Sequence, residues 1–138
     1  MAQVEMVIDS IRRAIRKNEW LIFLKDKSGQ YSLPIYVDSV YADALKDALR
    51  DMKLSDVVVN DPIWTEINRI LSEVDSASLV IDRFENGVFH TEFVVEWHGK
   101  SHTIDCPCGK AMALAVKTRT PIITDENILR SAGIGVTA

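Results

Sequence analysis

Two aspartates, Asp38 and Asp105, stand where a predicted strand gives way to a predicted helix. Folds that combine strands with helices gather polar side chains at such strand ends, and carboxylates there can hold a divalent metal for phosphodiester hydrolysis. Each aspartate is also a natural helix cap, because its side chain accepts hydrogen bonds from the backbone N–H groups of the first turn. The sequence leaves both roles open for both residues.

Lys110 lies in the polar stretch that begins at Asp105 and precedes an alanine-rich run. Backbone N–H groups at a helix start attract anions, so a lysine there would help to hold a phosphate group. The same stretch is also what an ordinary helix start looks like. Phosphate binding at Lys110 is therefore a hypothesis that stands beside a purely structural turn.

A basic cluster, the only one in the chain, comprises Arg12, Arg13, Arg16 and Lys17. Such a cluster can contact the phosphates of a nucleic acid, and it is also typical of a solvated end of an element. The formal net charge of −4 argues against a protein whose main task is to coat nucleic acid, which needs a broad basic surface. Any nucleic-acid contact would therefore be local.

The cysteines and histidines could in principle form a zinc site or a nucleophilic pair. Cys106 and Cys108 are one residue apart, and a disulfide between them would be strained, so we expect reduced thiols. With the three histidines they would form a zinc set, but the second ligand pair at the usual spacing is missing. A Cys-His nucleophile would need a group that orients the base, and none is evident, which favours a buried thiol.

Three hairpin signals organise the predicted strands. Turn residues at 26–29 separate apolar segments at 19–25 and 31–37, and Asn86-Gly87 suits a type I′ turn between strands at 79–84 and 88–97. A second tight turn, centred on Gly99 and Lys100, would place His102 opposite Trp97. Residues 122–123 resume as a short buried strand after Pro121.

Apolar residues at helical spacing predict the helices. These cover residues 39 to about 53, 62–74, 107–118 and a short segment that ends at Gly133. We therefore expect an α+β (mixed α/β) fold, a single domain over residues 1–138, with a mixed, mostly antiparallel sheet of about six strands packed with three longer helices and a short C-terminal helix. The chain has no apolar run long enough to span a membrane and no secretory leader, which indicates a cytoplasmic protein.

Three stretches in this order resemble the bifunctional nuclease domain family. They are Leu-Pro-Ile-Tyr-Val at 33–37, the Asn86-Gly87 hairpin that runs on to Asp105, and Ala-Met-Ala-Leu-Ala at 111–115 followed by Pro121. The family has a Leu-Pro-Ile-Trp-Ile-Gly strand before a helix that carries Glu-Ala, and a Val-Asp-Ala-Arg-Pro-Ser-Asp-Ala segment before its alanine-rich helix. The resemblance implies a mixed α and β fold, a homo-oligomer and a nuclease activity on RNA and DNA. It also makes residues 4–11 a strand.

The chain departs from the family pattern at the polar positions. Tyr41 stands where the family has its glutamate, and residues 107–110 (Pro-Cys-Gly-Lys) replace Arg-Pro-Ser-Asp, so only Asp105 of that set is retained. Two hypotheses follow. The first is a nuclease that uses Asp105 and Asp38, with Mg²⁺ or Mn²⁺ as a possible metal, and whose activity we expect to be weak or absent. The second is a non-catalytic binding or scaffold module. In either case we expect a two-fold dimer, because the small side chains of Ala111, Ala113 and Ala115 would let two copies of the helix approach closely.

Overall fold

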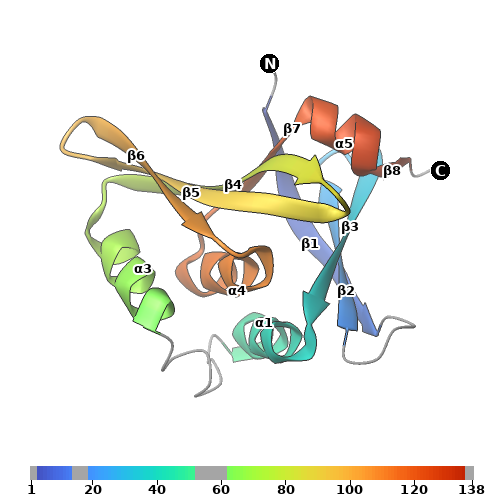
Figure 1. Ribbon diagram of the computed structural model, residues 1–138, viewed down its shortest axis with the longest axis horizontal. Coiled ribbons are helices and arrows are strands. Elements are labelled where there is room, and N and C mark those ends of the chain that lie inside the picture. The colour runs from blue at the N-terminus through green and yellow to red at the C-terminus, as the bar shows by residue number, and fades with distance from the viewer. Residues whose placement is uncertain (1–2, 14–18, 52–61, 136–138) are drawn as a thin grey trace.

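The chain forms one mixed sheet in the computed structural model, which describes residues 3–13, 19–51 and 62–135. Within these ranges the sheet has the order β6-β5-β4-β7-β1-β2-β3-β8, and β4 with β7 is its only parallel pair (Figure 1). The strands are β1 (Gln3–Arg13), β2 (Glu19–Asp26), β3 (Tyr31–Asp38), β4 (Ser76–Glu85), β5 (Val88–Trp97), β6 (Lys100–Cys106), β7 (Ile122–Asp125) and β8 (Ile134–Gly135). The predicted α+β class is confirmed, with seven longer strands and the two-residue β8 where about six had been expected.

Four helices accompany the sheet in the described ranges, namely α1 (Ser39–Asp51), α3 (Pro62–Glu73), α4 (Cys108–Thr118) and α5 (Glu126–Ala132). Figure 1 shows α4 between α1 and α3 on one side of the sheet, and α5 on the other side. The alanine-rich helix α4 is the centre of the core, as predicted, and residues 111–115 are at most 1% exposed. Small side chains allow α1 and α4 to pack closely. These are Ala42 and Ala44 of α1 and Ala111 and Ala115 of α4, which belong to the same buried core.

Two type I′ turns set the register of the β4-β5-β6 meander. Asn86 and Gly87 have φ of 53° and 77°, and His98 and Gly99 have the same two values. The second turn is therefore centred on His98-Gly99, and Trp97 pairs with Lys100 while His102 pairs with Val95. The expected pairing of His102 with Trp97 was wrong, because a histidine rather than a glycine takes the first left-handed position.

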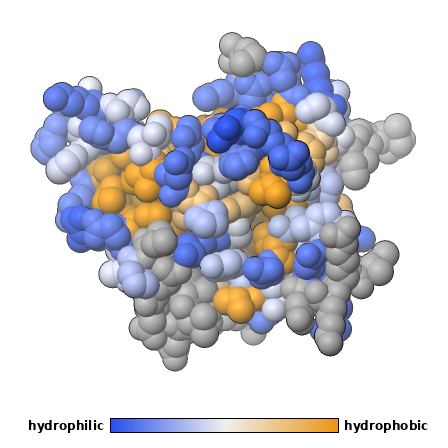
Figure 2. Space-filling view, viewed as in Figure 1, coloured by the Kyte–Doolittle hydropathy of each residue, from blue (hydrophilic) through white to orange (hydrophobic). Residues whose placement is uncertain are grey.

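The same meander forms one wall of an apolar hollow. Figure 2 shows hydrophobic side chains gathered in the region between the β5-β6 hairpin and α3. Ile70 of α3 and Val74, which follows the helix, line a space of about 290 Å³ together with Val95 and Ile104 of the two strands, and Trp97 also lines it. Trp97 is 46% exposed, so the sheet leaves a large apolar side chain at this end of the molecule.

Candidate functional site

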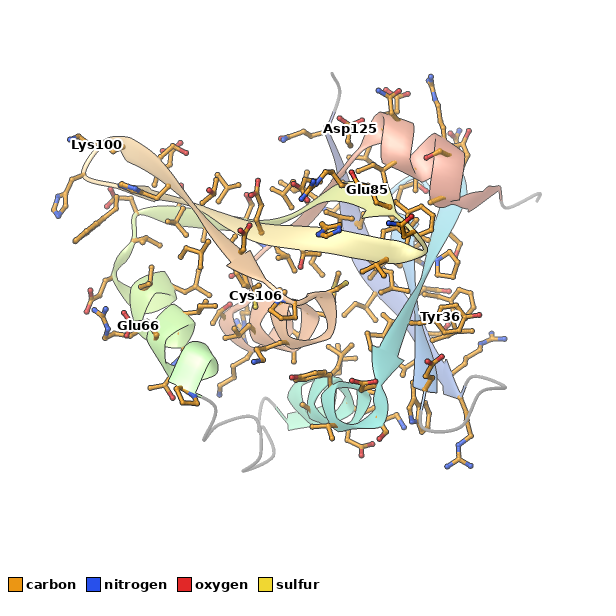
Figure 3. All side chains as sticks on the ribbon, viewed as in Figure 1. Tyr36, Glu66, Glu85, Lys100, Cys106 and Asp125 are labelled. Carbon is orange, nitrogen blue, oxygen red and sulfur yellow. The ribbon has the colours of Figure 1, made fainter. Side chains whose placement is uncertain are left out.

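A cleft of about 730 Å³ lies where β3 runs into α1 and β6 runs into α4. The strand ends bring Asp38 and Asp105 into its lining, and residues 88–91 at the start of β5 close another side. Figure 3 shows Cys106 at the end of β6, beside α4, and Tyr36 on β3 across this region. The two aspartates singled out from the sequence thus line the same cleft.

Two further carboxylates that sequence reasoning missed, Glu19 and Asp82, line the cleft as well. Glu19 lies directly opposite Asp38 in the β2-β3 ladder, a position at which Cβ atoms are about 5 Å apart. Because the turn at residues 26–31 fixes this register, counting back from it would have found Glu19. Asp82 lies within a register shift between Ile81 and Arg83, which no sequence signal marks.

One oxygen of each of these two added carboxylates is buried without a partner. Within the described ranges, Glu19 Oε2 and Asp82 Oδ1 make no hydrogen bond. Burial of a charged oxygen without a donor or a cation is costly, so such atoms mark places where a bound cation or water would be stabilised. The residues that line the cleft therefore include two carboxylate oxygens whose hydrogen-bonding capacity is unsatisfied.

The charged side chains around Asp82 and Asp105 also favour a positively charged ligand over a negatively charged one. Glu92 pairs with Asp105 across β5 and β6, and its pKa is raised by burial and then by the nearby charges of Asp82 and Asp105. Arg83 is the only arginine or lysine among the described lining residues, and it is already close to Asp82 at 3.8 Å and Glu85 at 3.7 Å. A cleft of this charge repels phosphate groups unless a cation accompanies them.

Tyr41 packs against the start of α4, and both line the cleft. A Cβ added to Gly109 would lie 3.0 Å from Tyr41 Cδ2, so the ring packs directly on the first turn and a larger residue there would have to displace it. Pro107 occupies the N-cap position, and no side chain caps the helix. Asp105 therefore does not cap α4, and of its two predicted roles only a role in the cleft fits the geometry.

Lys110 is placed differently from the other predicted site residues. Lys110 is only 6% exposed, and its Nζ lies 6.0 Å from the centroid of the Tyr41 ring. It is not among the residues that line the cleft. The ammonium group thus lies behind the phenol ring, where it adds positive charge near the cleft without projecting into it.

The cysteines and histidines are dispersed. Cys106 and Cys108 line the cleft without forming a disulfide, and burial raises the pKa of Cys108 to about 12, with a smaller contribution from Cys106. A thiol that stays protonated near neutral pH is a poor nucleophile. His90 lines the cleft, whereas His98 stacks on Trp97 and His102 faces α3. In the described part of the chain, no three His, Cys, Asp or Glu side chains are close enough together to hold a metal ion.

The basic cluster lies apart from these carboxylates. Arg12 and Arg13 are exposed at the end of β1 and do not line the cleft. Arg16 and Lys17, predicted as members of the same cluster, fall outside the described residues. The geometry therefore brings Asp38 and Asp105 together, and it separates them from Lys110, Arg12 and Arg13.

Comparison with known proteins agrees with the fold. No curated protein matches the sequence, and no helix in the described ranges is long and apolar enough to cross a membrane. The family model of the bifunctional nuclease domain matches residues 22–137, which include β3, the β4-β5-β6 meander and α4. The chain therefore belongs to the bifunctional nuclease domain family.

Proposed function

We propose that the cleft is a site of slow, divalent-cation-dependent phosphodiester hydrolysis on RNA or DNA. The observation that carries the proposal is the convergence of Asp38 and Asp105 in one cleft with the unpartnered oxygens of Glu19 and Asp82. Carboxylates that meet in a partly enclosed space are suited to bind a cation and, through it, a phosphate group. Two cysteines beside the cleft that form no disulfide suit a reducing location such as the cytoplasm, which is part of the same proposal.

The donor set fits a hydrated Mg²⁺ or Mn²⁺ ion better than a fully caged one. Mg²⁺ commonly keeps several waters and is held by only one or two carboxylates together with substrate phosphates. Asp38 and Asp105 would supply such ligands from the two strand ends that meet at the cleft. When bound, the ion would activate a water molecule and neutralise the charge that develops on the phosphate.

The other residues near the cleft explain why turnover should be slow. Tyr41 offers a phenol at the position where the family resemblance implies a glutamate, so it adds neither a cation ligand nor a base. Lys110 carries its charge close to the same ring. An ammonium group there would oppose a divalent cation by roughly a kilocalorie per mole or more at surface dielectric. The chain thus keeps part of an acidic site and lacks two of its carboxylates.

The test is cleavage of single-stranded RNA and DNA by the purified protein in Mg²⁺ or Mn²⁺. We expect slow turnover that Asp105→Asn reduces by about tenfold or more, because a cation ligand is lost. Asp43→Asn, which removes an exposed carboxylate of α1 outside the cleft, is the matched control and should leave the rate unchanged. Equal cleavage by the wild type and Asp105→Asn would overturn the proposal.

A second candidate is a non-catalytic, homo-oligomeric binding or scaffold module of the same fold. It is favoured by the packing of Tyr41 on Gly109, which covers part of the helix start that a phosphate would otherwise approach. This candidate predicts no turnover with either metal, together with a stable oligomer. The cleavage assay and a mass measurement on the same sample separate the two.

A further inference from the structure

We propose that a second hollow, which adjoins the cleft, binds an unpaired base of single-stranded RNA or DNA by stacking. This aromatic hollow has a volume of about 650 Å³ and lies between β3 and the tip of the β4-β5 hairpin, and its lining includes Tyr36, Phe84, Val88 and Phe89. A base site here deepens the proposed hydrolysis and rests on it, because it assigns a place to the base of a nucleotide whose phosphate lies in the cleft.

Exposed apolar side chains are concentrated at the aromatic hollow. Half of the large apolar side chains that are exposed in the described ranges line it, namely Tyr36 at 58%, Phe84 at 42% and Val88 at 56%. The centroid of the Phe84 ring lies 4.4 Å from that of Phe89, which is buried. Phe84 is therefore held in place while part of its surface stays open, and a ring that is already held loses little conformational freedom when a base stacks on it.

The lining of the aromatic hollow suits an uncharged planar group. Glu19 is the only aspartate, glutamate, lysine or arginine among the described residues that line it. Cys108 also lines it and remains an uncharged thiol near neutral pH, because burial raises its pKa to about 12. A phosphate would meet one carboxylate and no cation here, whereas a nucleobase is uncharged and presents a flat face to an aromatic ring.

The aromatic hollow and the cleft share a wall. Five residues line both, and these are Glu19, Tyr36, Val88, Phe89 and Cys108. Asp38 follows Tyr36 by two residues on β3, so the two side chains are on the same face of the strand, about 7 Å apart along it. Figure 1 shows the tip of the β4-β5 hairpin beside this strand. A nucleotide whose phosphate is bound through a cation at Asp38 would therefore place its base against Tyr36.

The size of the aromatic hollow favours a base from a single strand. Its volume is in the range of about 300–1,000 Å³ that is typical of small-ligand sites, so it admits one base with its sugar. Bases within a duplex are stacked on their neighbours, whereas unpaired bases can turn outward onto aromatic side chains. Asn86, in the turn of the hairpin, also lines the hollow, and its amide can donate and accept hydrogen bonds at the edge of a base.

The experiment measures base binding without metal and without phosphate. Adenosine is titrated in EDTA into isotope-labelled protein, and nuclear magnetic resonance follows the backbone amide signals and the ring protons of adenosine. We expect saturable binding at millimolar concentration, with the largest amide shifts at Tyr36, Gly87 and Val88. The adenosine ring protons should shift upfield, as protons do above the face of an aromatic ring.

Variants test the role of the rings. Tyr36→Ala should bind adenosine about fivefold more weakly, and Tyr36→Ala/Phe84→Ala about tenfold or more weakly, because stacking surface is lost. Tyr36→Phe keeps the ring and should keep the affinity. Trp97→Ala is the matched control, since it removes a similarly exposed ring that lines neither the cleft nor the aromatic hollow. Thermal unfolding of each variant checks that it is folded.

Three results would overturn the inference. They are no binding at millimolar adenosine, equal affinity in the wild type and in Tyr36→Ala/Phe84→Ala, and a mass by light scattering that falls from two chains to one in Tyr36→Ala, which would show that a second copy covers the hollow. Adenosine bound at the hollow together with no cleavage in Mg²⁺ or Mn²⁺ would overturn only the proposed hydrolysis, because adenosine binding is measured without metal.

Discussion

Tyr41 is the residue that most limits the chemistry of the cleft. Its ring packs on Gly109 at the first turn of α4, and Lys110 Nζ lies 6.0 Å from the ring centroid. A carboxylate at this position would join Asp38 and Asp105 in the lining of the same cleft. One substitution would therefore add to the cleft the carboxylate that the family resemblance implies at this position.

We predict that Tyr41→Glu binds Mn²⁺ about tenfold more tightly than the wild type, because one more carboxylate faces the cleft. The loss of ring packing should lower the free energy of unfolding by about 2 kcal/mol. Isothermal titration calorimetry measures the first effect and urea denaturation the second. Tyr41→Gln is the matched control, since it loses the same packing and adds no charge. Tighter Mn²⁺ binding by both variants would attribute the gain to the space vacated by the ring and contradict the prediction.

Sequence reasoning reached part of this site for a clear physical reason. Asp38 and Asp105 could be found because each ends a strand whose hydrophobic pattern is legible, and polar side chains collect at such ends. Asp82 could not be found, since its position depends on a register shift in β4. The burial of Lys110 was also hidden, because a lysine is normally exposed and only the packing of α1 on α4 encloses it.

At the scale of elements, the β2-β3 hairpin depends on one buried carboxylate. Asp26 is 5% exposed, and its side chain accepts hydrogen bonds from Ser28 Oγ and from the Tyr31 N–H, the latter at 2.8 Å. Burial alone would raise the pKa of Asp26, but these and neighbouring backbone hydrogen bonds outweigh it and lower the pKa below 3.8. The same hairpin sets Glu19 opposite Asp38, so the turn positions part of the cleft.

We predict that Asp26→Ala lowers the free energy of unfolding near neutral pH by about 1–3 kcal/mol, because the Tyr31 N–H loses its acceptor. A carboxylate with a lowered pKa in the folded state stabilises the protein above its ordinary pKa, and that contribution is lost as the pH falls through the folded value. The difference between the wild type and the variant should therefore shrink as the pH falls below that ordinary value, to about pH 3. Urea denaturation at both pH values measures it. A difference that is constant with pH would show that the charge of Asp26 contributes nothing.

The elements themselves were largely predictable, since their signals are local. Asn86-Gly87 marks one hairpin, and Pro121 follows a helix that ends at Thr118. His98 shows the limit, because a left-handed histidine has no distinctive sequence signal and shifted the expected pairing of β5 with β6. The order of the strands also depends on contacts between segments far apart in the chain, such as the parallel pairing of β4 with β7.

At the scale of the whole molecule, the helix face that was expected to form a dimer is buried within a single chain. Ala111, Ala113 and Ala115 are at most 1% exposed inside the chain's own core, so α4 does not offer them to a second copy. The surface that remains suited to association is the outer edge of the sheet. β6 is the first strand in the described sheet, and one side of its backbone lacks a strand partner there.

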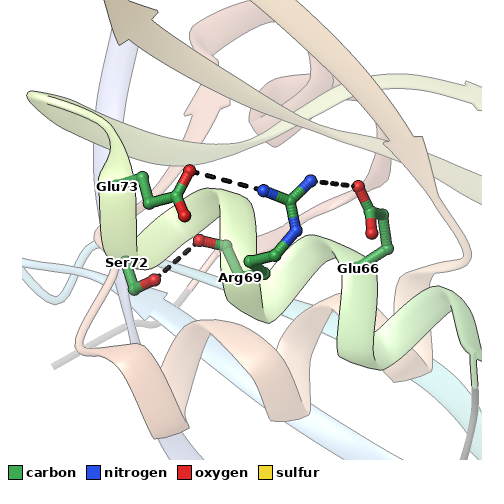
Figure 4. Close-up of polar contacts among 4 residues, drawn as sticks. All are labelled: Glu66, Arg69, Ser72 and Glu73. Carbon is green, nitrogen blue, oxygen red and sulfur yellow. Dashed lines mark hydrogen bonds and ion pairs between the residues drawn. The ribbon is translucent and has the colours of Figure 1, made fainter.

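This edge adjoins the apolar hollow between α3 and the β5-β6 hairpin. Ile104 and Trp97 contribute to the hollow, and Arg69 and Glu73 of α3 stand at its rim. Figure 4 shows that Arg69 pairs with Glu66 and Glu73 along the helix, which fixes the polar side of that rim. An apolar centre with a polar rim beside an unpaired strand is the arrangement typical of protein interfaces.

We predict that the protein is a two-fold dimer that uses this edge, with a mass by light scattering of about twice the chain mass of 15.5 kDa at micromolar concentration. Trp97→Glu should shift the mass to that of one chain, because a charge would be buried at the centre of the contact. Val40→Glu is the matched control, since Val40 on α1 is similarly exposed, at 44% against 46% for Trp97, and lies far along the chain from β6. A wild-type mass of one chain would contradict the dimer. A Trp97→Glu variant that is still a dimer would show that the contact lies on another surface.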